Sequence, residues 1–296
     1  MIKITPEKYL IWHIQGGLGK NVAASALCAT LRQKYEDRKI IIVNSYPEIF
    51  LNNPYVDKVY ELNVNPHFYE NYIFNKDVLI FKHEPYNQTG HILKTKHLIE
   101  NWCDLLQVPY ENQHPQLFPN YAQKINVQKW LRSKPSIVLN TCGGPQNSLD
   151  YYNWARDMPQ EIANLIVEKY KNIYHIFHIT RTGGYKLDNV ERIDYAIPAM
   201  ELFGLLINSS KRFLIDSCLQ HAACAVKMPS VVFWIATSPK VFGYSIHDNI
   251  QAYEKEPKNN LILSYTFDYQ FTNNLHECPY NTLDEMFDLG KVQSII

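Results

Sequence analysis

The 296-residue sequence lacks an excess of charge of either sign, because 29 lysine and arginine residues balance 29 aspartate and glutamate residues. This balance argues against a nucleic-acid partner, which would favour a basic surface. No apolar run approaches the roughly 20 residues that span a bilayer, and the first residues, MIKITPEKYL, lack the apolar stretch of a signal peptide. We therefore expect a cytoplasmic protein without a transmembrane segment, and a peripheral position at the inner membrane face stays open.

Metal-binding and disulfide patterns are also missing. The six cysteines are scattered and contain no Cys-x-x-Cys pair, and the 11 histidines form no His-Glu-x-x-His cluster. Such spacings would indicate a zinc site or a disulfide framework. The sequence therefore predicts reduced thiols, no bound metal and no cofactor.

The chain opens with a strand–loop–helix–strand unit predicted over residues 9–43, and its loop contains three glycines: Gly16, Gly17 and Gly19. The loop is not a P-loop, because Ile14 stands at the first glycine position and Asn21 at the hydroxyl position. It is not a dinucleotide fingerprint either, because that pattern requires glycine at Val22. What remains is a backbone that a ligand or an opposite domain can approach closely, or simply a tight turn.

A second unit of the same kind is predicted over residues 212–244, where an apolar strand ends at Asp216 and a helix rich in alanine follows. Open α/β sheets bind ligands at the carboxyl ends of their strands, which is where Asp216 and Ser217 stand. Ser217 can cap the helix, and the first helical N–H groups can hold an anion that His221 would also contact. The alternative interpretation is a capped core helix with a solvated histidine.

This segment resembles the donor-binding motif of the heptosyltransferases, which are family 9 glycosyltransferases with the GT-B fold. The family's motif is Asp-Ser/Thr-Gly-x-x-His followed by an alanine-rich turn, and here it reads DSCLQHAA from Asp216. Residues 197–210 resemble the helix that leads into that strand, and residues 236–239 resemble the family's Gly-x-Thr-x-Pro. The resemblance implies a divergent member with an α/β GT-B fold, in which two Rossmann-like domains face a cleft.

The resemblance also implies a nucleotide-sugar site in the second half of the chain. Arg156 takes the place of the family's lysine on the donor phosphates, and a guanidinium suits phosphate well; a solvated charge is the alternative. Thr182 would lie near the nucleoside, and Met200 near the base, although methionine in a helix more often fills a core. The predicted set is Arg156, Thr182, Met200, Asp216, Ser217, Cys218, Leu219 and His221.

On the acceptor side, the family's loop reads Gly-x-Gly-Asp, and its aspartate acts as the base. Here Lys20 stands at that position, and a lysine is a poor base unless its pKa is strongly lowered. Lys20 could instead contact an anionic acceptor or a phosphate. The predicted strand over residues 78–82 is followed by substitute candidates for the base, Glu84, His83 and His91, each of which can also be a plain surface residue.

A proline-rich stretch, residues 109–119, is the predicted linker, with a domain boundary near residue 125. Residues 1–125 would form the acceptor-side domain, and residues 126–274 the nucleotide-sugar-binding domain. By analogy with other GT-B chains, we expect residues 275–296 to return to the first domain as a helix.

These features favour a glycosyltransferase that moves a sugar from a nucleotide-sugar donor to a hydroxyl of a glycan or lipid-linked glycan. No Asp-x-Asp sequence occurs, so the transfer is expected to need no metal, and inversion follows from the resemblance alone. Two alternatives stay open. The changed motif positions Lys20 and Cys218 motivate an inactive GT-B protein that binds a nucleotide or glycan, and sugar-nucleotide epimerases share the architecture. The fold cannot choose among the three.

Overall fold

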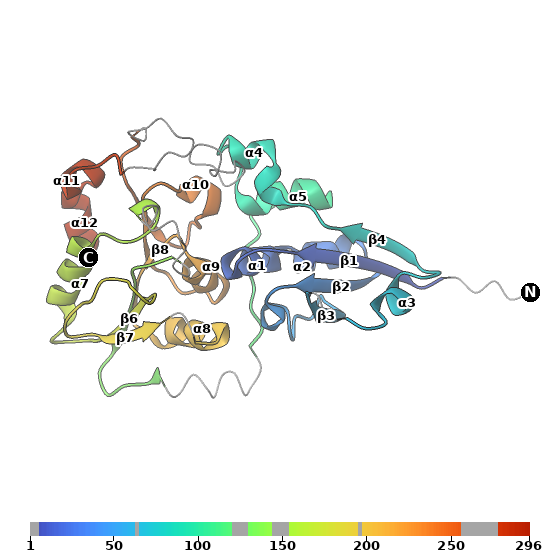
Figure 1. The fold of residues 1–296 in the computed structure, drawn as a ribbon, viewed down its shortest axis with the longest axis horizontal. Helices are drawn as coiled ribbons and strands as arrows, with labels where there is room; N and C mark the ends of the chain where they lie inside the picture. Colours follow the sequence, from blue (N-terminus) through green and yellow to red (C-terminus); the bar gives the residue numbers. More distant parts are fainter. Residues whose placement is uncertain (1–5, 63–64, 120–129, 144–153, 195–196, 256–277) are drawn as a thin grey trace, which may run out of the picture.

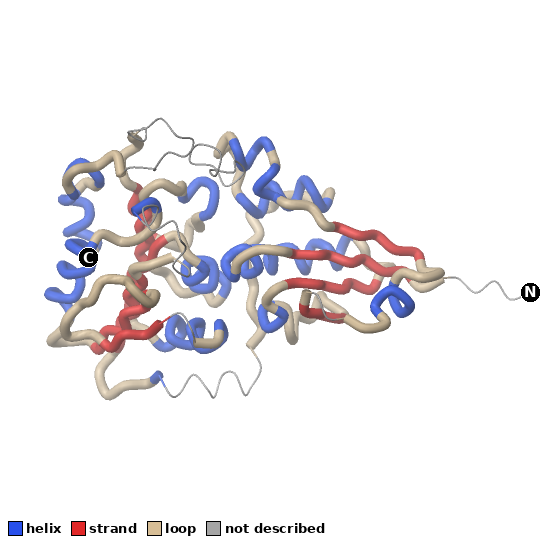
Figure 2. The backbone as a smooth tube through the Cα atoms, in the orientation of Figure 1, coloured by secondary structure: helices blue, strands red, loops and turns tan. Residues whose placement is uncertain are grey.

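A computed structural model describes residues 6–62, 65–119, 130–143, 154–194, 197–255 and 278–296. Its strands form two sheets, and all of their strand pairs are parallel. The first sheet has the order β3-β2-β1-β4 and the second has the order β10-β9-β8-β5-β6-β7. Figure 2 shows them as two separate groups of strands. The expected α/β class with two parallel sheets is therefore confirmed.

The first half of the chain supplies the four-stranded sheet (Figure 1). Its strands are β1 (Lys8–Ile14), β2 (Lys39–Asn44), β3 (Lys58–Glu61) and β4 (Asp77–Phe81). Its helices are α1 (Leu18–Ala24), α2 (Cys28–Lys34), α3 (Phe68–Tyr72), α4 (Thr89–Ile92) and α5 (Leu98–Leu106), with 3-10 turns at Ser25–Leu27, Pro47–Ile49 and Pro85–Asn87. The single helix expected within the unit of residues 9–43 is thus split into α1 and α2 by a 3-10 turn.

The second half supplies the six-stranded sheet. Its strands are β5 (Ser136–Asn140), β6 (His175–Thr180), β7 (Glu191–Asp194), β8 (Lys211–Ile215), β9 (Val231–Trp234) and β10 (Asp248–Gln251). Its helices are α7 (Gln160–Tyr170), α8 (Ala199–Asn208), α9 (Cys218–Ala225), α10 (Pro239–Phe242), α11 (Leu283–Met286) and α12 (Leu289–Ile295).

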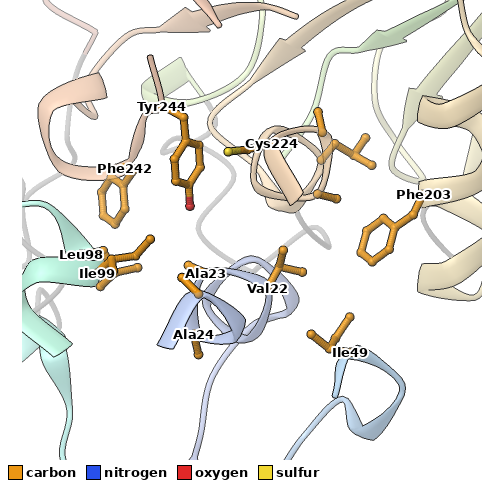
Figure 3. Close-up of a cluster of buried hydrophobic side chains, with 14 of the residues drawn as sticks. Val22, Ala23, Ala24, Ile49, Leu98, Ile99, Phe203, Cys224, Phe242 and Tyr244 are labelled. Atoms are coloured by element: carbon orange, nitrogen blue, oxygen red, sulfur yellow. The ribbon is translucent and has the colours of Figure 1, made fainter. Parts of the chain in front are cut away.

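One hydrophobic core runs through both halves of the chain, because α1 packs on α9. Four alanines in these helices are fully buried: Ala23, Ala24, Ala222 and Ala223. Such short side chains let the two helix backbones approach closely. Figure 3 shows Val22 and Ala23 of α1 facing α9, with Phe203 of α8 beside them. The alanine-rich composition of α9 therefore serves contact between the two halves.

The carboxyl terminus does not return to the first half. Val292 and Ile296 are buried in a core cluster with Ile162 and Ile166 of α7. The Tyr170 hydroxyl, also on α7, donates to the Ile296 carbonyl. The expectation for residues 275–296 is therefore wrong for the described residues 278–296, because their apolar side chains are buried against the second half. The expected boundary near residue 125 lies outside the described residues.

Candidate active site

The second sheet reverses its strand order between β5 and β8, the point where open α/β sheets bind ligands. Asn140 ends β5, and its amide joins the two loops that diverge there. Its Oδ1 accepts a hydrogen bond from Ser217 Oγ at 2.7 Å, and its Nδ2 donates to the Cys142 carbonyl at 2.9 Å. Asp216 and Ser217, which the sequence predicted as site residues, therefore lie at this crevice.

Ser217 is the amino-terminal cap of α9, as the sequence predicted. Its Oγ accepts the Leu219 N–H at 3.2 Å. The cap thus satisfies one of the N–H groups that the prediction assigned to an anion. The Leu219 side chain is fully buried, so only its backbone can contribute to a site.

Arg156 lies against the start of α9. Its Nε and Nη2 donate to the Asp216 carbonyl at 2.9 and 2.6 Å, and its Nε is 3.6 Å from Asp216 Oδ2. A Cβ added at Gly143 would lie 3.2 Å from Nη2, so a side chain at this position would crowd the guanidinium. The predicted phosphate ligand is therefore held beside the α9 amino terminus.

A second ion pair supports this edge of the sheet, and no sequence motif pointed to it. Arg181, which follows β6, donates from both terminal nitrogens to the Asp157 carboxylate. Asp157 also accepts the Gly143 N–H at 3.2 Å. The loops after β5 and β6 are thereby fixed to the residue that follows Arg156.

The structure does not give His221 the free nitrogen that the prediction required. Gln220 Nε2 donates to the Phe242 carbonyl at 3.0 Å, so the same amide donates to His221 Nε2 at 3.1 Å. The proton of His221 is then on Nδ1, which lies 2.7 Å from the Tyr244 hydroxyl. Burial, together with the nearby charges of His97, His247 and Arg156, lowers the pKa of His221 to about 3. His221 is a neutral group that is bonded inside the protein, and it does not face an anion.

The two other predicted donor residues lie apart from this network. Thr182 is exposed in the turn after β6. Met200, in the first turn of α8, is half-buried and packs on the core, which fits core filling.

The first sheet reverses its strand order between β1 and β4, and the predicted catalytic residues meet there. Lys20 of α1 donates to Glu84, which follows β4, and its Nζ lies 4.8 Å from the centre of the Tyr86 ring. The Lys20 side chain is 5% exposed and that of Glu84 is 38% exposed. Burial lowers the pKa of Lys20, while the hydrogen bond and the charge of Glu84 oppose that shift. The accessible member of the pair is therefore the carboxylate.

His91 joins the same cluster. Its ring stacks on Tyr86 with centroids 4.7 Å apart and meets Phe242 of α10 edge-on at 5.5 Å. The residue is 6% exposed, and burial lowers the pKa of His91 to about 4. Three candidates from distant parts of the sequence thus come together, although His91 is covered by its neighbours.

Two kinds of contact place the cluster of Lys20, Glu84 and His91 against the second half of the chain. His97, which caps α5, contacts the Gly243 carbonyl through Nε2 at 3.0 Å. Tyr244 is surrounded by the rings of His97, His114, His221 and His247, with centroids 5.4 to 6.1 Å away. Figure 3 shows Tyr244 with Phe242, Leu98 and Ile99 on one side and Cys224 on the other. No pattern in the sequence singled out Tyr244.

The three loop glycines have different roles. Gly16 has φ +111°, and Gly17 has open space around its Cβ position. A Cβ on Gly19 would lie 3.1 Å from His221 Cδ2 and 3.2 Å from the Cys218 Cα. Gly19 therefore permits the close approach of the opposite half, which was one of the two interpretations of the loop.

We expect Gly19→Val to lower the free energy of unfolding by about 2 kcal/mol, because extra carbons in a packed contact force α1 away from α9. Gly17→Val is the matched control. It should cost under about 1 kcal/mol, because its Cβ enters open space and only the weaker capping of α1 by valine remains as a loss. Urea denaturation of both variants measures the difference. Equal losses would contradict the close contact at Gly19.

Neither a metal cluster nor a membrane span occurs among the described residues. No three His, Cys, Asp or Glu side chains in the part of the chain that the structure describes are grouped as metal ligands. No described helix is long and apolar enough to cross a membrane.

No family model matches the sequence, and no curated protein matches it. Solved structures do match. The glycosyltransferase TibC of enterotoxigenic E. coli is 14% identical, with a TM-score of 0.65 over 100% of this chain and 74% of that one. E. coli ADP-heptose LPS heptosyltransferase II is 13% identical, with a TM-score of 0.61 over 84% and 92% of the two chains. The family 9 glycosyltransferase of Veillonella parvula is 10% identical, with a TM-score of 0.59 over 84% and 86%.

The chain has the GT-B fold of the heptosyltransferases. In this GT-B fold, the glycine loop that contains Lys20 and the DSCLQHAA segment are neighbours in space, through Gly19 and Cys218. The residues that carried the resemblance in the sequence therefore lie together.

Proposed function

We propose that this protein is a glycosyltransferase that moves a sugar from a nucleotide-sugar donor to a hydroxyl of a glycan or lipid-linked glycan. The observation that carries the proposal is the Lys20–Glu84 pair at the switch point of the first sheet, on the helix that packs against α9. The structural neighbours support the reaction class, and one of them, TibC, was solved in complex with ADP-D-β-D-heptose.

Glu84 is the base in this proposal. Its carboxylate takes the proton of the acceptor hydroxyl, and the acceptor oxygen then forms a bond to the anomeric carbon. The bond from that carbon to the diphosphate oxygen breaks, and the nucleoside diphosphate leaves with the electron pair. Inversion at the anomeric carbon accompanies a single displacement of this kind.

Lys20 positions the base. The ammonium contacts the carboxylate directly and holds it at the switch point of the first sheet. This arrangement explains how a lysine can stand where the family has its aspartate: the carboxylate comes from the loop after β4 instead.

The leaving diphosphate is stabilised by Arg156 and by the amino-terminal amides of α9, which is the usual place for an anion in such folds. His221 acts indirectly, because its bonds to Gln220 and Tyr244 fix α9 against α10. The proposal assigns the charge of the diphosphate to these groups without a metal ion.

Replacing Arg156 tests the donor site. We expect Arg156→Gln to weaken binding of the matching nucleoside diphosphate about 10- to 100-fold, because a charged hydrogen bond contributes about 1.5–3 kcal/mol. Calorimetric titration with ADP, GDP, UDP and CMP measures this. Arg132→Gln is the control, since Arg132 pairs with Glu191 at the surface. If both variants bind like the wild type, the donor site lies elsewhere.

One observation favours the inactive binding protein as the second candidate. His221 is engaged inside the protein, so one group of the family's motif is not directed at a ligand. Product analysis separates the candidates: a glycoside with free nucleoside diphosphate supports the transferase, whereas tight nucleotide binding without turnover supports the second candidate.

A further inference from the structure

A groove of about 340 Å³ lies on the outer face of the first sheet, opposite the face that packs on α1. We call it the outer-face groove. It is lined by Ile11, His13, Val43, Asn65, Phe68, Ile73, Ile80 and Lys82. Its volume falls within the range of small-molecule sites, about 300–1,000 Å³.

The strand register explains why these side chains share one face. Ile11 pairs with Ile80 of β4, and His13 pairs with Val43 of β2. Alternate residues of a strand point to the same face, so Ile11 and His13 face away from α1, whereas Leu10 and Trp12 are buried toward the helices. Parallel sheets usually have both faces covered by helices.

The described residues cover the outer face only in part. The short helix α3 lies by the narrow end of the molecule, where the strands begin (Figure 1). Toward the carboxyl ends of the strands, Ile80 remains 52% exposed. Two aromatic residues beside the lining residues in the chain, Tyr69 and Phe74, are 58% and 55% exposed. Exposed apolar surface of this kind marks an interaction site.

The groove is apolar along its walls and cationic at one end. Lys82 is exposed directly after β4, and no carboxylate in the described residues pairs with it. His13 Nδ1 is buried without a hydrogen-bond partner. Burial and the charge of Lys82 lower the pKa of His13, so its ring is neutral and can accept or donate a hydrogen bond. An apolar wall with an ammonium and an imidazole at its end is complementary to an alkyl phosphate.

We propose that the outer-face groove binds the lipid phosphate part of the acceptor, with its alkyl chain along Ile11, Val43 and Ile80 and its phosphate at Lys82 and His13. This inference rests on the proposed function. Lys82 stands two residues before Glu84, so a sugar carried on that phosphate passes over the end of β4 to the base. The exposed Tyr69 and Phe74 suit a ligand that is presented by a lipid surface.

Binding of decyl phosphate below its micellar concentration tests the site without any turnover. We expect calorimetric binding to the wild type, a loss of at least 10-fold in Ile80→Asp and a several-fold loss in Lys82→Ala. Ile173→Asp is the matched control, because Ile173 is 61% exposed in the second half and should leave binding unchanged. Inorganic phosphate alone should bind much more weakly than decyl phosphate.

The donor nucleotide provides an independent readout. Nucleoside diphosphate binding should be the same in Ile80→Asp and the wild type, which also shows that the variant is folded. If Ile80→Asp does not bind the nucleotide, decyl phosphate binding to Lys82→Ala is compared with the wild type instead. Absence of decyl phosphate binding, or equal binding to wild type and Ile80→Asp, overturns the groove while leaving the donor site intact. Decyl phosphate binding that depends on Ile80, in a protein without transfer activity, supports the groove and contradicts only the proposed reaction.

Discussion

Glu84→Gln is expected to reduce kcat/KM for sugar transfer by about 10²- to 10⁴-fold, because the amide keeps the shape of the side chain and cannot take the acceptor proton. The affinity for the nucleoside diphosphate should not change, since the donor groups belong to the second half. A steady-state assay of nucleoside diphosphate release, with calorimetry on the same sample, measures both quantities.

Two further variants sharpen this test. Glu61→Gln is the control, because Glu61 is an exposed carboxylate at the end of β3, near the same sheet edge. Lys20→Met should lower kcat/KM and leave the affinity for the nucleoside diphosphate unchanged, because the Glu84 carboxylate loses the ammonium that holds it in place. Near wild-type activity in Glu84→Gln would exclude Glu84 as the base and would make His91 the next candidate for that role.

Mild acid is expected to destabilise the folded protein by at least about 3 kcal/mol between pH 7 and pH 4.5. Burial lowers the pKa of His97 and of His247 to about 4, from an ordinary value of 6.5. The unfolded chain therefore takes up protons first as the pH falls below 6.5, whereas the folded protein does so only near pH 4. The stabilisation is complete above pH 6.5 and is lost as the pH falls toward 4. Each histidine contributes about 1.4 kcal/mol for every pH unit between its unfolded and folded pKa values.

The location of these histidines decides which part of the molecule responds. His97 bonds to the Gly243 carbonyl, and His247 bonds to the Gln220 carbonyl through Nε2 at 3.0 Å. Protonation adds charge around Tyr244, at the contact between the two halves. Urea denaturation at pH 7.5, 6.0 and 4.5 measures the loss. His97→Gln should flatten the pH dependence, whereas His83→Gln, at an exposed position, should not alter it. A pH-independent stability would contradict the buried neutral state of the cluster.

Local sequence predicted the structural features that depend on a single element of the chain. The capped strand–helix turn at Ser217 follows from an apolar strand, a capping hydroxyl and alanines in the next helix, and the structure confirms that cap. Arg156 was selected from the resemblance, and it does lie beside α9. The α/β class with parallel sheets was predictable for the same reason, since buried apolar strands alternate with helices.

Predictions that depended on distant contacts fared less well. His221 was expected to face an anion, but Gln220 and Tyr244 occupy both of its nitrogens. The last helix was expected on the first half, yet Val292 is buried against α7. Neither outcome is encoded by spacing, because the His221–Tyr244 contact and the burial of Val292 both depend on which surfaces meet in the folded chain.

The sequence by itself determined the elements of this protein: its strands, the glycine loop, the cap at Ser217 and the presence of Lys20 where an aspartate was expected. Only the tertiary structure decided that Lys20 pairs with Glu84, because β4 lies next to β1 and brings residues 64 positions apart to one switch point. It also decided that, among the described residues, a groove remains on one face of the first sheet. Strand register and helix cover are properties of the assembled sheet, and they set which side chains meet.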